Sequence, residues 1–269
     1  MEIFLLIIVF LFGISVGSFA NVIIYRLPEN QSIVLPRSYC PACRKSIAAY
    51  DNIPLLSFLL LRGRCRHCRA VIPPRYPLVE LLMGLMFVAV FLLLSARGEA
   101  LLRFPFYWYF CFSLVVLSLI DCKYFILPDL LTYPLLGVGF LLAVLDPARM
   151  GAEDIPSALL QALIGAAVGG GSLWLIGLLG KAAFRKEAMG MGDVKLMAAV
   201  GAWQGWGMAL FAIFLGALVA ALVGILLILL KKARWGSKLP FGPYLALGSL
   251  LTLFFGPALI SWYLGFYLK

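Results

Sequence analysis

The sequence is poor in charged residues. Only 13% of its 269 residues are Asp, Glu, Lys or Arg, about half the fraction of an average soluble domain, whereas 64% are apolar. A soluble core cannot absorb so much apolar surface, which excludes an ordinary soluble domain. Lipid can absorb it, because a run of about 20 apolar residues spans roughly 30 Å of hydrocarbon. The composition therefore predicts an all-α polytopic membrane protein.

Two familiar patterns are also missing. No basic segment precedes the first apolar run, so residues 1–24 lack the signature of a cleavable signal peptide and are expected to remain as the first transmembrane helix. No G-x-G-x-x-G fingerprint follows a strand pattern, and no βαβ alternation exists, which argues against a Rossmann-type nucleotide site.

The apolar runs predict about eight transmembrane helices. They cover residues 3–24, 77–95, 104–121, 129–146, 157–180, 193–205, 207–230 and 242–266. Only the turn Gln204-Gly205-Trp206-Gly207 separates the sixth from the seventh, so one long kinked helix is the alternative there. Small residues let helices approach closely in lipid, and we expect this role for Gly165, Gly169 and Gly216.

The basic residues predict the orientation. The net charge of +10 gathers in three gaps between apolar runs, at 25–76, 181–192 and 231–240. With eight spans these gaps share one side, which the positive-inside rule assigns to the cytosol, with both termini outside. The expected domains are a first helix (1–24), a cytosolic loop (25–76) and a seven-helix membrane domain (77–269). Because topology accounts for the charge, we expect no nucleic-acid partner.

Four cysteines in the 25–76 segment are spaced like metal ligands. They form two C-x2-C turns with 21 residues between them, and they are Cys40, Cys43, Cys65 and Cys68. This spacing is typical of tetrahedral four-cysteine zinc sites, which have no open position for water and are structural. The alternative is two disulfides, which are rare in the cytosol. A basic zinc ribbon that binds nucleic acid is a further alternative.

Four carboxylates lie at span ends, where ionisable groups are costly. Asp129 has the position of an N-cap for the fourth span, and Glu80 is expected in the first turn of the second span, where the helix dipole favours negative charge. Asp193, which follows Gly190-Met191-Gly192, could also be an N-cap. The glycines before it would allow a close backbone or substrate approach.

Asp121 requires another explanation, because it ends the third span, where the helix dipole opposes a negative charge. The predicted topology places Asp121 and Asp193 on the same cytosolic side. Two neighbouring carboxyl groups can hold a water, with one acting as general base on it while the other donates to a scissile carbonyl. The pair therefore indicates an aspartic peptidase.

The motifs of the chain resemble those of the type IV prepilin peptidases, the leader peptidase/N-methyltransferases. The resemblance covers nearly the whole chain, and its parts occur in the family's order. They are Gly17-Ser18-Phe19-Ala20-Asn21, Ser38-Tyr39-Cys40-Pro41-Ala42-Cys43, Asn52-Ile53-Pro54-Leu55-Leu56-Ser57, Leu61-Arg62-Gly63-Arg64-Cys65-Arg66-His67-Cys68, Arg75-Tyr76-Pro77-Leu78-Val79-Glu80, Ile120-Asp121, Leu127-Pro128-Asp129, Met191-Gly192-Asp193-Val194-Lys195 and Pro240-Phe241-Gly242-Pro243-Tyr244.

The resemblance implies a bifunctional enzyme of the bacterial inner membrane. Asp121 and Asp193 fall on the family's catalytic positions and the four cysteines on its zinc site. Such enzymes cut the basic leader from type IV prepilins or type II secretion pseudopilins after a glycine, then methylate the new N-terminus with S-adenosylmethionine. Carboxylates such as Glu80, Asp129 or Glu187 are expected to attract the basic leader.

Two other classes remain open from the residues. A presenilin-type intramembrane peptidase also uses Gly-x-Gly-Asp, but its partner aspartate lies within a span after Tyr, whereas Asp121 follows Ile120 at a span end. A transporter or zinc-bearing scaffold would place polar residues near the midplane on broken helices, whereas these carboxylates gather at one face.

Overall fold

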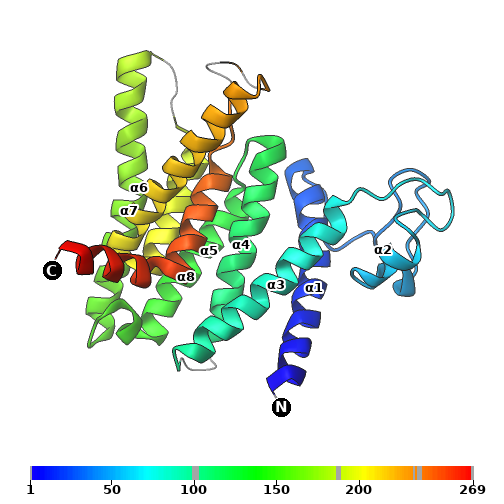
Figure 1. Ribbon diagram of the computed structural model, residues 1–269, viewed down its shortest axis with the longest axis horizontal. Coiled ribbons are helices and arrows are strands. Elements are labelled where there is room, and N and C mark those ends of the chain that lie inside the picture. Colours follow the sequence, from blue (N-terminus) through cyan, green and yellow to red (C-terminus); the bar gives the residue numbers. More distant parts are fainter. Residues whose placement is uncertain (1, 99–102, 186–188, 233, 235–237, 268–269) are drawn as a thin grey trace. The chain divides into compact units, whose positions relative to one another are not determined.

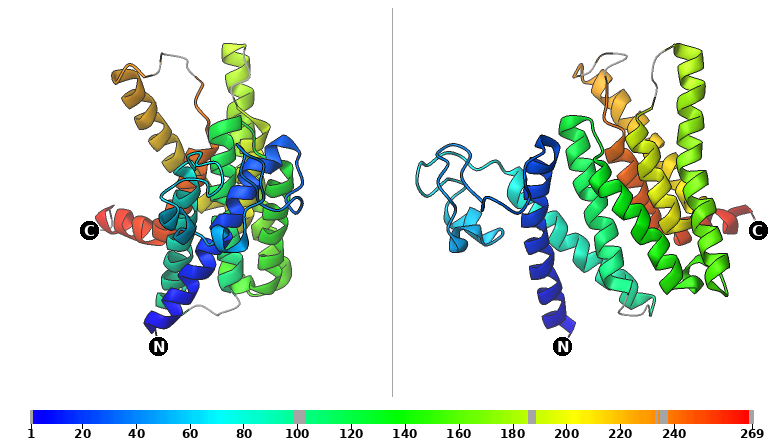
Figure 2. Two further views of the ribbon diagram at one scale, coloured as in Figure 1. Left: turned by 90° about the vertical axis from the view of Figure 1, so that its right-hand side faces the viewer. Right: turned by 180° about the vertical axis from the view of Figure 1, so that it is seen from behind.

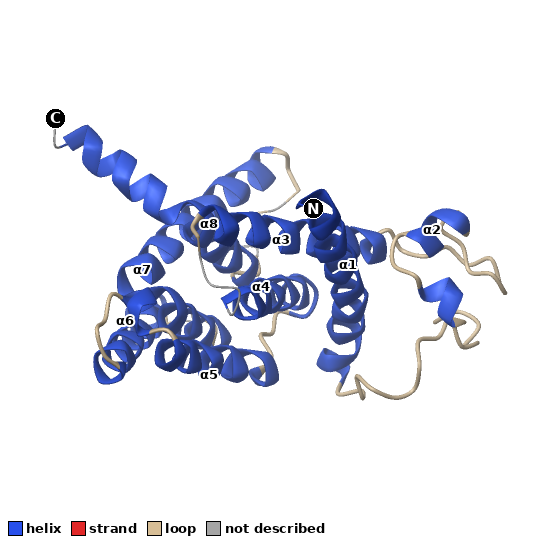
Figure 3. Ribbon diagram, turned by 90° about the horizontal axis from the view of Figure 1, so that it is seen from below, coloured by secondary structure: helices blue, strands red, loops and turns tan. Residues whose placement is uncertain are grey.

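The computed structural model describes residues 2–98, 103–185, 189–232, 234 and 238–267, and these are helical with connecting loops (Figure 3). Among them, extended pairing is limited to two isolated bridges. Lipid offers no partners for backbone N–H and C=O groups, so spanning segments must satisfy them internally as helices. The predicted all-α membrane class is therefore confirmed.

The chain divides into two compact units, Met1–Phe112 and Ser113–Lys269. In the first unit, α1 (Glu2–Arg26) and α3 (Arg75–Ala96) lie side by side (Figure 2), and α4 (Arg103–Tyr124) begins. A Cβ on Gly17 of α1 would lie only 2.7 Å from the Cα of Glu80, so this glycine allows the two backbones to touch.

The segment between α1 and α3 contains only short helices. They are η1 (Leu27–Glu29), η2 (Ala49–Asn52) and α2 (Leu56–Leu60). Between residues 27 and 74, only Cys40, Ser57 and Gly63 are buried. This loop therefore has no apolar core of its own, and something other than hydrophobic burial must hold it in shape.

The second unit contains the remainder of α4 and most of the apolar helices (Figure 1). They are α5 (Asp129–Leu145), α6 (Ile155–Phe184), α7 (Met191–Leu229) and α8 (Gly242–Tyr267), with η3 (Pro147–Met150) between α5 and α6. In the described chain, six helices are long and apolar enough to cross a membrane, and α5 is a shorter apolar helix. Each of the eight predicted segments is thus helical.

The sixth and seventh predicted spans both lie in α7, which is interrupted at Gly205. There φ is 79° and ψ is 167°, a conformation essentially restricted to glycine. A Cβ on Gly169 of α6 would contact both Met197, before the break, and Ala209, after it. The helix therefore continues as two arms, 191–204 and 206–229, which both pack on α6.

Glycines bring α6 and α7 into backbone contact, as predicted for Gly165 and Gly169. A Cβ on Gly165 would overlap the carbonyl oxygen of Gly201, and a Cβ on Gly169 would overlap that of Met197. Gly216 of α7 similarly lies against the backbone of Tyr244 in α8. Close packing of this kind replaces the hydrophobic drive that helices lack in lipid.

Gly165→Ala is expected to destabilise the second unit, because the new methyl group meets backbone that cannot rotate away. Overpacking costs about 2 kcal/mol, which lowers the unfolding temperature of the detergent-solubilised protein by about 5 °C. Gly171 provides the control: it lies in the same helix with nothing within 4 Å of its Cβ position. Gly171→Ala should leave the unfolding temperature unchanged or raise it; equal losses in both variants would contradict the packing argument.

Candidate functional site

The loop of the first unit brings its four predicted ligand cysteines together. The sulfur atoms of Cys40, Cys43, Cys65 and Cys68 all lie within 4.8 Å of one another. The Sγ atoms of Cys40 and Cys68 are 3.8 Å apart, and all four thiols are free. Four ligands at about 2.3 Å from a tetrahedral zinc are about 3.8 Å apart, whereas a disulfide is about 2.05 Å long. The cluster therefore fits a metal ion better than disulfides.

Both C-x2-C turns have the same local structure. The amide of Arg44 donates to the carbonyl of Cys40, and the amide of Arg69 donates to that of Cys65. Both arginines have a left-handed conformation, with φ of 59° and 61°. Backbone N–H groups of Cys68 and then His67 donate to the Cys65 sulfur and lower its pKa to about 6. The second turn thus favours the thiolate of Cys65, the form that binds metals.

An ion pair connects the second turn to η2. The Arg66 guanidinium donates from Nε and Nη2 to the two carboxylate oxygens of Asp51, at 2.7 and 2.6 Å. This hydrogen bond and the positive charge of Arg66 hold the pKa of Asp51 below its usual range. Two parallel bonds fix orientation as well as distance, so the pair contributes to the shape of the loop.

The second unit places the two predicted aspartates at adjoining helix ends. Asp121 lies in the last turn of α4, and Asp193 lies in the first turn of α7. Their side chains are nearly buried, at 6% and 9% exposure. The two carboxyl groups are close enough for the charge of Asp121 to act on Asp193. This proximity could not be derived from the sequence.

The first residue of α8 provides a partner for Asp121. The Gly242 amide donates to its Oδ2 at 2.9 Å, and a Cβ on Gly242 would lie 2.8 Å from the same oxygen. The positive end of the α8 dipole therefore faces a carboxylate that the dipole of α4 opposes. Gly242 belongs to the motif Pro240-Phe241-Gly242-Pro243-Tyr244, for which the sequence predicts no role. The position of Asp121 at a helix C-terminus, which is unfavourable for a carboxylate, is the one signal that predicts a nearby N–H donor.

The glycines before Asp193 permit close contacts, as expected. The Gly190 amide donates to the Asp193 carboxylate, whose Oδ2 lies 3.1 Å from the Cβ position of Gly190. A Cβ on Gly192 would lie 2.8 Å from the Cβ of Leu127. The loop that follows Asp121 therefore packs directly against the start of α7, and a larger residue at Gly192 would displace that loop.

Asp129 does not cap α5, so that interpretation was wrong. It lies inside the first turn and makes no capping bond; its carboxylate instead accepts from Nζ of Lys195 at 2.7 and 2.9 Å. The lysine also lies over the Tyr133 ring, 5.0 Å from its centroid. Because Lys195 neutralises its charge, Asp129 is a poor candidate for attracting a basic leader. Glu187, the other expected carboxylate of this region, lies outside the described residues.

Glu80 does not lie in the first turn of its helix, so that interpretation was also wrong. The helix begins at Arg75, ahead of Pro77, which leaves Glu80 more than one turn inside α3. The side chain is 8% exposed and accepts the Leu55 amide at 2.8 Å. A side chain this buried cannot attract a basic leader peptide from solution, so Glu80 must have another role.

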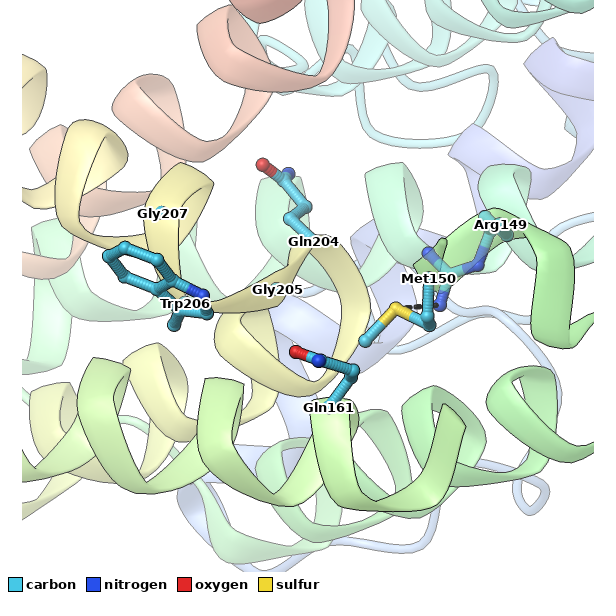
Figure 4. Close-up of a pocket in the computed structure, with 7 residues that line it drawn as sticks. All are labelled: Arg149, Met150, Gln161, Gln204, Gly205, Trp206 and Gly207. Carbon is cyan, nitrogen blue, oxygen red and sulfur yellow. Dashed lines mark hydrogen bonds between the residues drawn. The ribbon is translucent and has the colours of Figure 1, made fainter. Parts of the chain in front are cut away.

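A cavity of about 290 Å³ lies in the second unit around the break in α7 (Figure 4). It is lined by Arg149, Met150, Gln161, Gln204, Gly205, Trp206 and Gly207, and neither aspartate contributes to it. The Arg149 guanidinium is engaged with the Trp203 carbonyl and with the sulfur of Met150. Asp193 lies at the opposite end of the first α7 arm, so the cavity is separate from the aspartate pair.

Comparison with known proteins identifies the family. Residues 11–94 match the model of the bacterial peptidase A24 N-terminal domain, and residues 108–225 match the type IV leader peptidase family. The prepilin leader peptidase/N-methyltransferase of Aeromonas salmonicida is 40% identical over 96% of this chain and 93% of its own length. Proteins of the same name from Aeromonas hydrophila and Pseudomonas aeruginosa are 41% and 36% identical, with similar coverage. No solved structure matches the chain. The chain belongs to the type IV leader peptidase family.

Proposed function

We propose that the chain is a prepilin leader peptidase and N-methyltransferase in which Asp121 and Asp193 form the peptidase site. The observation that carries the proposal is that both carboxyl groups are nearly buried at helix ends, close enough for the charge of one to act on the other. One carboxylate takes a proton from a water molecule, whose oxygen attacks the scissile carbonyl carbon. The other, protonated, donates to the carbonyl oxygen. The C–N bond of the tetrahedral intermediate then breaks, the carbonyl re-forms as its proton returns to the second aspartate, and the first aspartate gives the proton taken from water to the leaving amine.

The substrates we propose are type IV prepilins or type II secretion pseudopilins. Their basic leader lies on the cytosolic side and their apolar helix lies in lipid, so the junction is at the interface. Both aspartates lie at helix ends, where the positive-inside pattern predicts cytosol. We therefore place the enzyme in the bacterial inner membrane as a multi-pass protein, with the site facing the cytosol.

The metal we propose for the four-cysteine cluster is zinc in a structural role. Four protein thiolates would fill its coordination shell, leaving no position for a reacting water. We propose that the chain has three domains, which are helix 1–24, zinc-binding loop 25–76 and peptidase domain 77–269. S-adenosylmethionine would supply the methyl group, and the donor must bind without a Rossmann fingerprint.

Incubation of the purified, detergent-solubilised chain with a full-length prepilin tests the proposal. We expect a single cut after the leader's glycine and, when S-adenosylmethionine is present, a mass gain of one CH2 unit on the new N-terminus. A transporter or scaffold would leave the prepilin intact. A presenilin-type peptidase would cut inside the apolar helix. Mass spectrometry of the products separates these outcomes.

A further inference from the structure

A buried polar cluster lies between α1 and α3 in the first unit, and the proposed aspartate pair does not use it. It consists of Ser18 and Asn21 from α1 and Glu80 from α3; Asn21 is 3% exposed and Glu80 8%. Gly17 lies against the Cα of Glu80, so the two helix backbones are close at this point, and the Ser18 side chain of α1 reaches the Glu80 carboxylate. Buried polar groups of this kind are expensive unless they have partners.

The cluster has more acceptors than donors. The Glu80 carboxylate accepts from the Leu55 amide at 2.8 Å and from the Ser18 hydroxyl. The Asn21 amide nitrogen donates to the carbonyls of Tyr76 at 3.0 Å and of Gly17 at 3.3 Å. These two carbonyls fix the orientation of the side chain, because the reverse orientation would set an oxygen against both.

One acceptor remains unpaired. The Asn21 Oδ1 is buried and has no hydrogen-bond partner in the described structure. The Arg75 guanidinium lies over the Tyr76 ring, 5.4 Å from the centroid, and its buried Nε also has no hydrogen-bond partner among the described residues. Asn21 contacts α3 at Tyr76, four residues before Glu80, so the unpaired carbonyl oxygen and the buried carboxylate belong to the same stretch of the α1–α3 interface. An ammonium group has several N–H donors and is suited to acceptors of both kinds.

We propose that the cluster of Ser18, Asn21 and Glu80 binds the new α-ammonium group of the cut prepilin and that Glu80 takes a proton from it. This inference rests on the proposed function and assigns its methyl-transfer step to the first unit. Glu80 accepts one ammonium proton, which frees the nitrogen lone pair. The nitrogen then forms a bond to the methyl carbon of a sulfonium donor as the carbon–sulfur bond breaks, and its electron pair goes to sulfur. The product is a methylammonium and a neutral thioether.

Glu80→Gln separates this role from a structural one. The Gln carbonyl oxygen can still accept the Leu55 amide, but the side chain has no negative charge and cannot take the proton. We expect methylation of a synthetic peptide that already begins with a free N-terminal phenylalanine to fall at least about a hundredfold. Cleavage of prepilin by the same variant should stay within about twofold. Glu29→Gln makes the same chemical change on the exposed loop and should alter neither rate.

Binding provides a readout that does not depend on turnover. Phenylalaninamide, which has an ammonium group, should bind the wild-type protein in calorimetry, whereas N-acetylphenylalaninamide should bind at least about tenfold more weakly. Asn21→Ala should weaken phenylalaninamide binding by a similar factor while the unfolding temperature shows that the protein remains folded.

Equal binding of the two amides, or full methylation of the pre-cut peptide by Glu80→Gln, would overturn the inference. Loss of cleavage and methylation together with a lower unfolding temperature would also overturn it, in favour of a structural tie. The pre-cut peptide and the two amides need no cleavage, so they test this cluster even if the enzyme does not cut prepilin. Failure to cut prepilin would instead reject the proposed peptidase activity.

Discussion

Asp121→Asn and Asp193→Asn should each lower the rate of leader cleavage by at least about a hundredfold, the smallest contribution expected of a general acid or base. Asn is close to Asp in size, and at position 121 its carbonyl oxygen can still accept the Gly242 amide. The fold is therefore expected to survive while the proton-transfer capacity of the pair is lost. Gel analysis of prepilin processing by each purified variant measures the effect.

Asp154→Asn is the matched control for these variants. Asp154 caps the start of α6 by accepting the Ser157 amide, and Asn caps helices as well as Asp does. The change removes the same charge without weakening the helix, so cleavage should equal that of the wild type. Both site variants should still methylate a pre-cut peptide. Near-normal cleavage by Asp121→Asn or by Asp193→Asn would contradict a two-aspartate mechanism.

The helices could be predicted from the sequence because lipid leaves the backbone no alternative. Apolar length alone located the long apolar helices of the described chain, and a turn with two glycines located the break in α7 at Gly205. Residues whose role depends on a distant partner could not be predicted. Asp129 has the sequence position of a helix cap, but Lys195, 66 residues later, holds its carboxylate.

The site shows the same division. Cysteine spacing is a local signal, so it predicts which four thiols meet. Proximity of Asp121 to Asp193 is a tertiary fact, and only the adverse dipole at Asp121 indicated that a partner was needed. That partner includes the Gly242 amide, a backbone group with no signature in sequence. The burial of Glu80 was hidden because its helix begins earlier than the proline suggests.

Removing the four-cysteine site should unfold the loop between α1 and α3. We expect about one zinc per chain in the purified protein and almost none in a Cys40→Ser/Cys68→Ser double variant, which removes one ligand from each turn. Only three residues between 27 and 74 are buried, so the loop has little apolar stabilisation to retain its fold. Structural zinc contributes about 10 kcal/mol or more, which exceeds any other interaction there.

Cys122→Ser tests whether this result is specific to the cluster. Cys122 is an exposed free thiol outside the group of four, so its loss should change neither the zinc content nor the susceptibility of the loop to proteolysis. The double variant should be cut by trypsin within 27–74, because exposed arginines such as Arg37 and Arg62 would then lie in unfolded backbone that fits the protease, while the helices of the second unit resist. A double variant that contains no zinc but keeps a protease-resistant loop would show that the Asp51–Arg66 pair and the backbone turns suffice without metal.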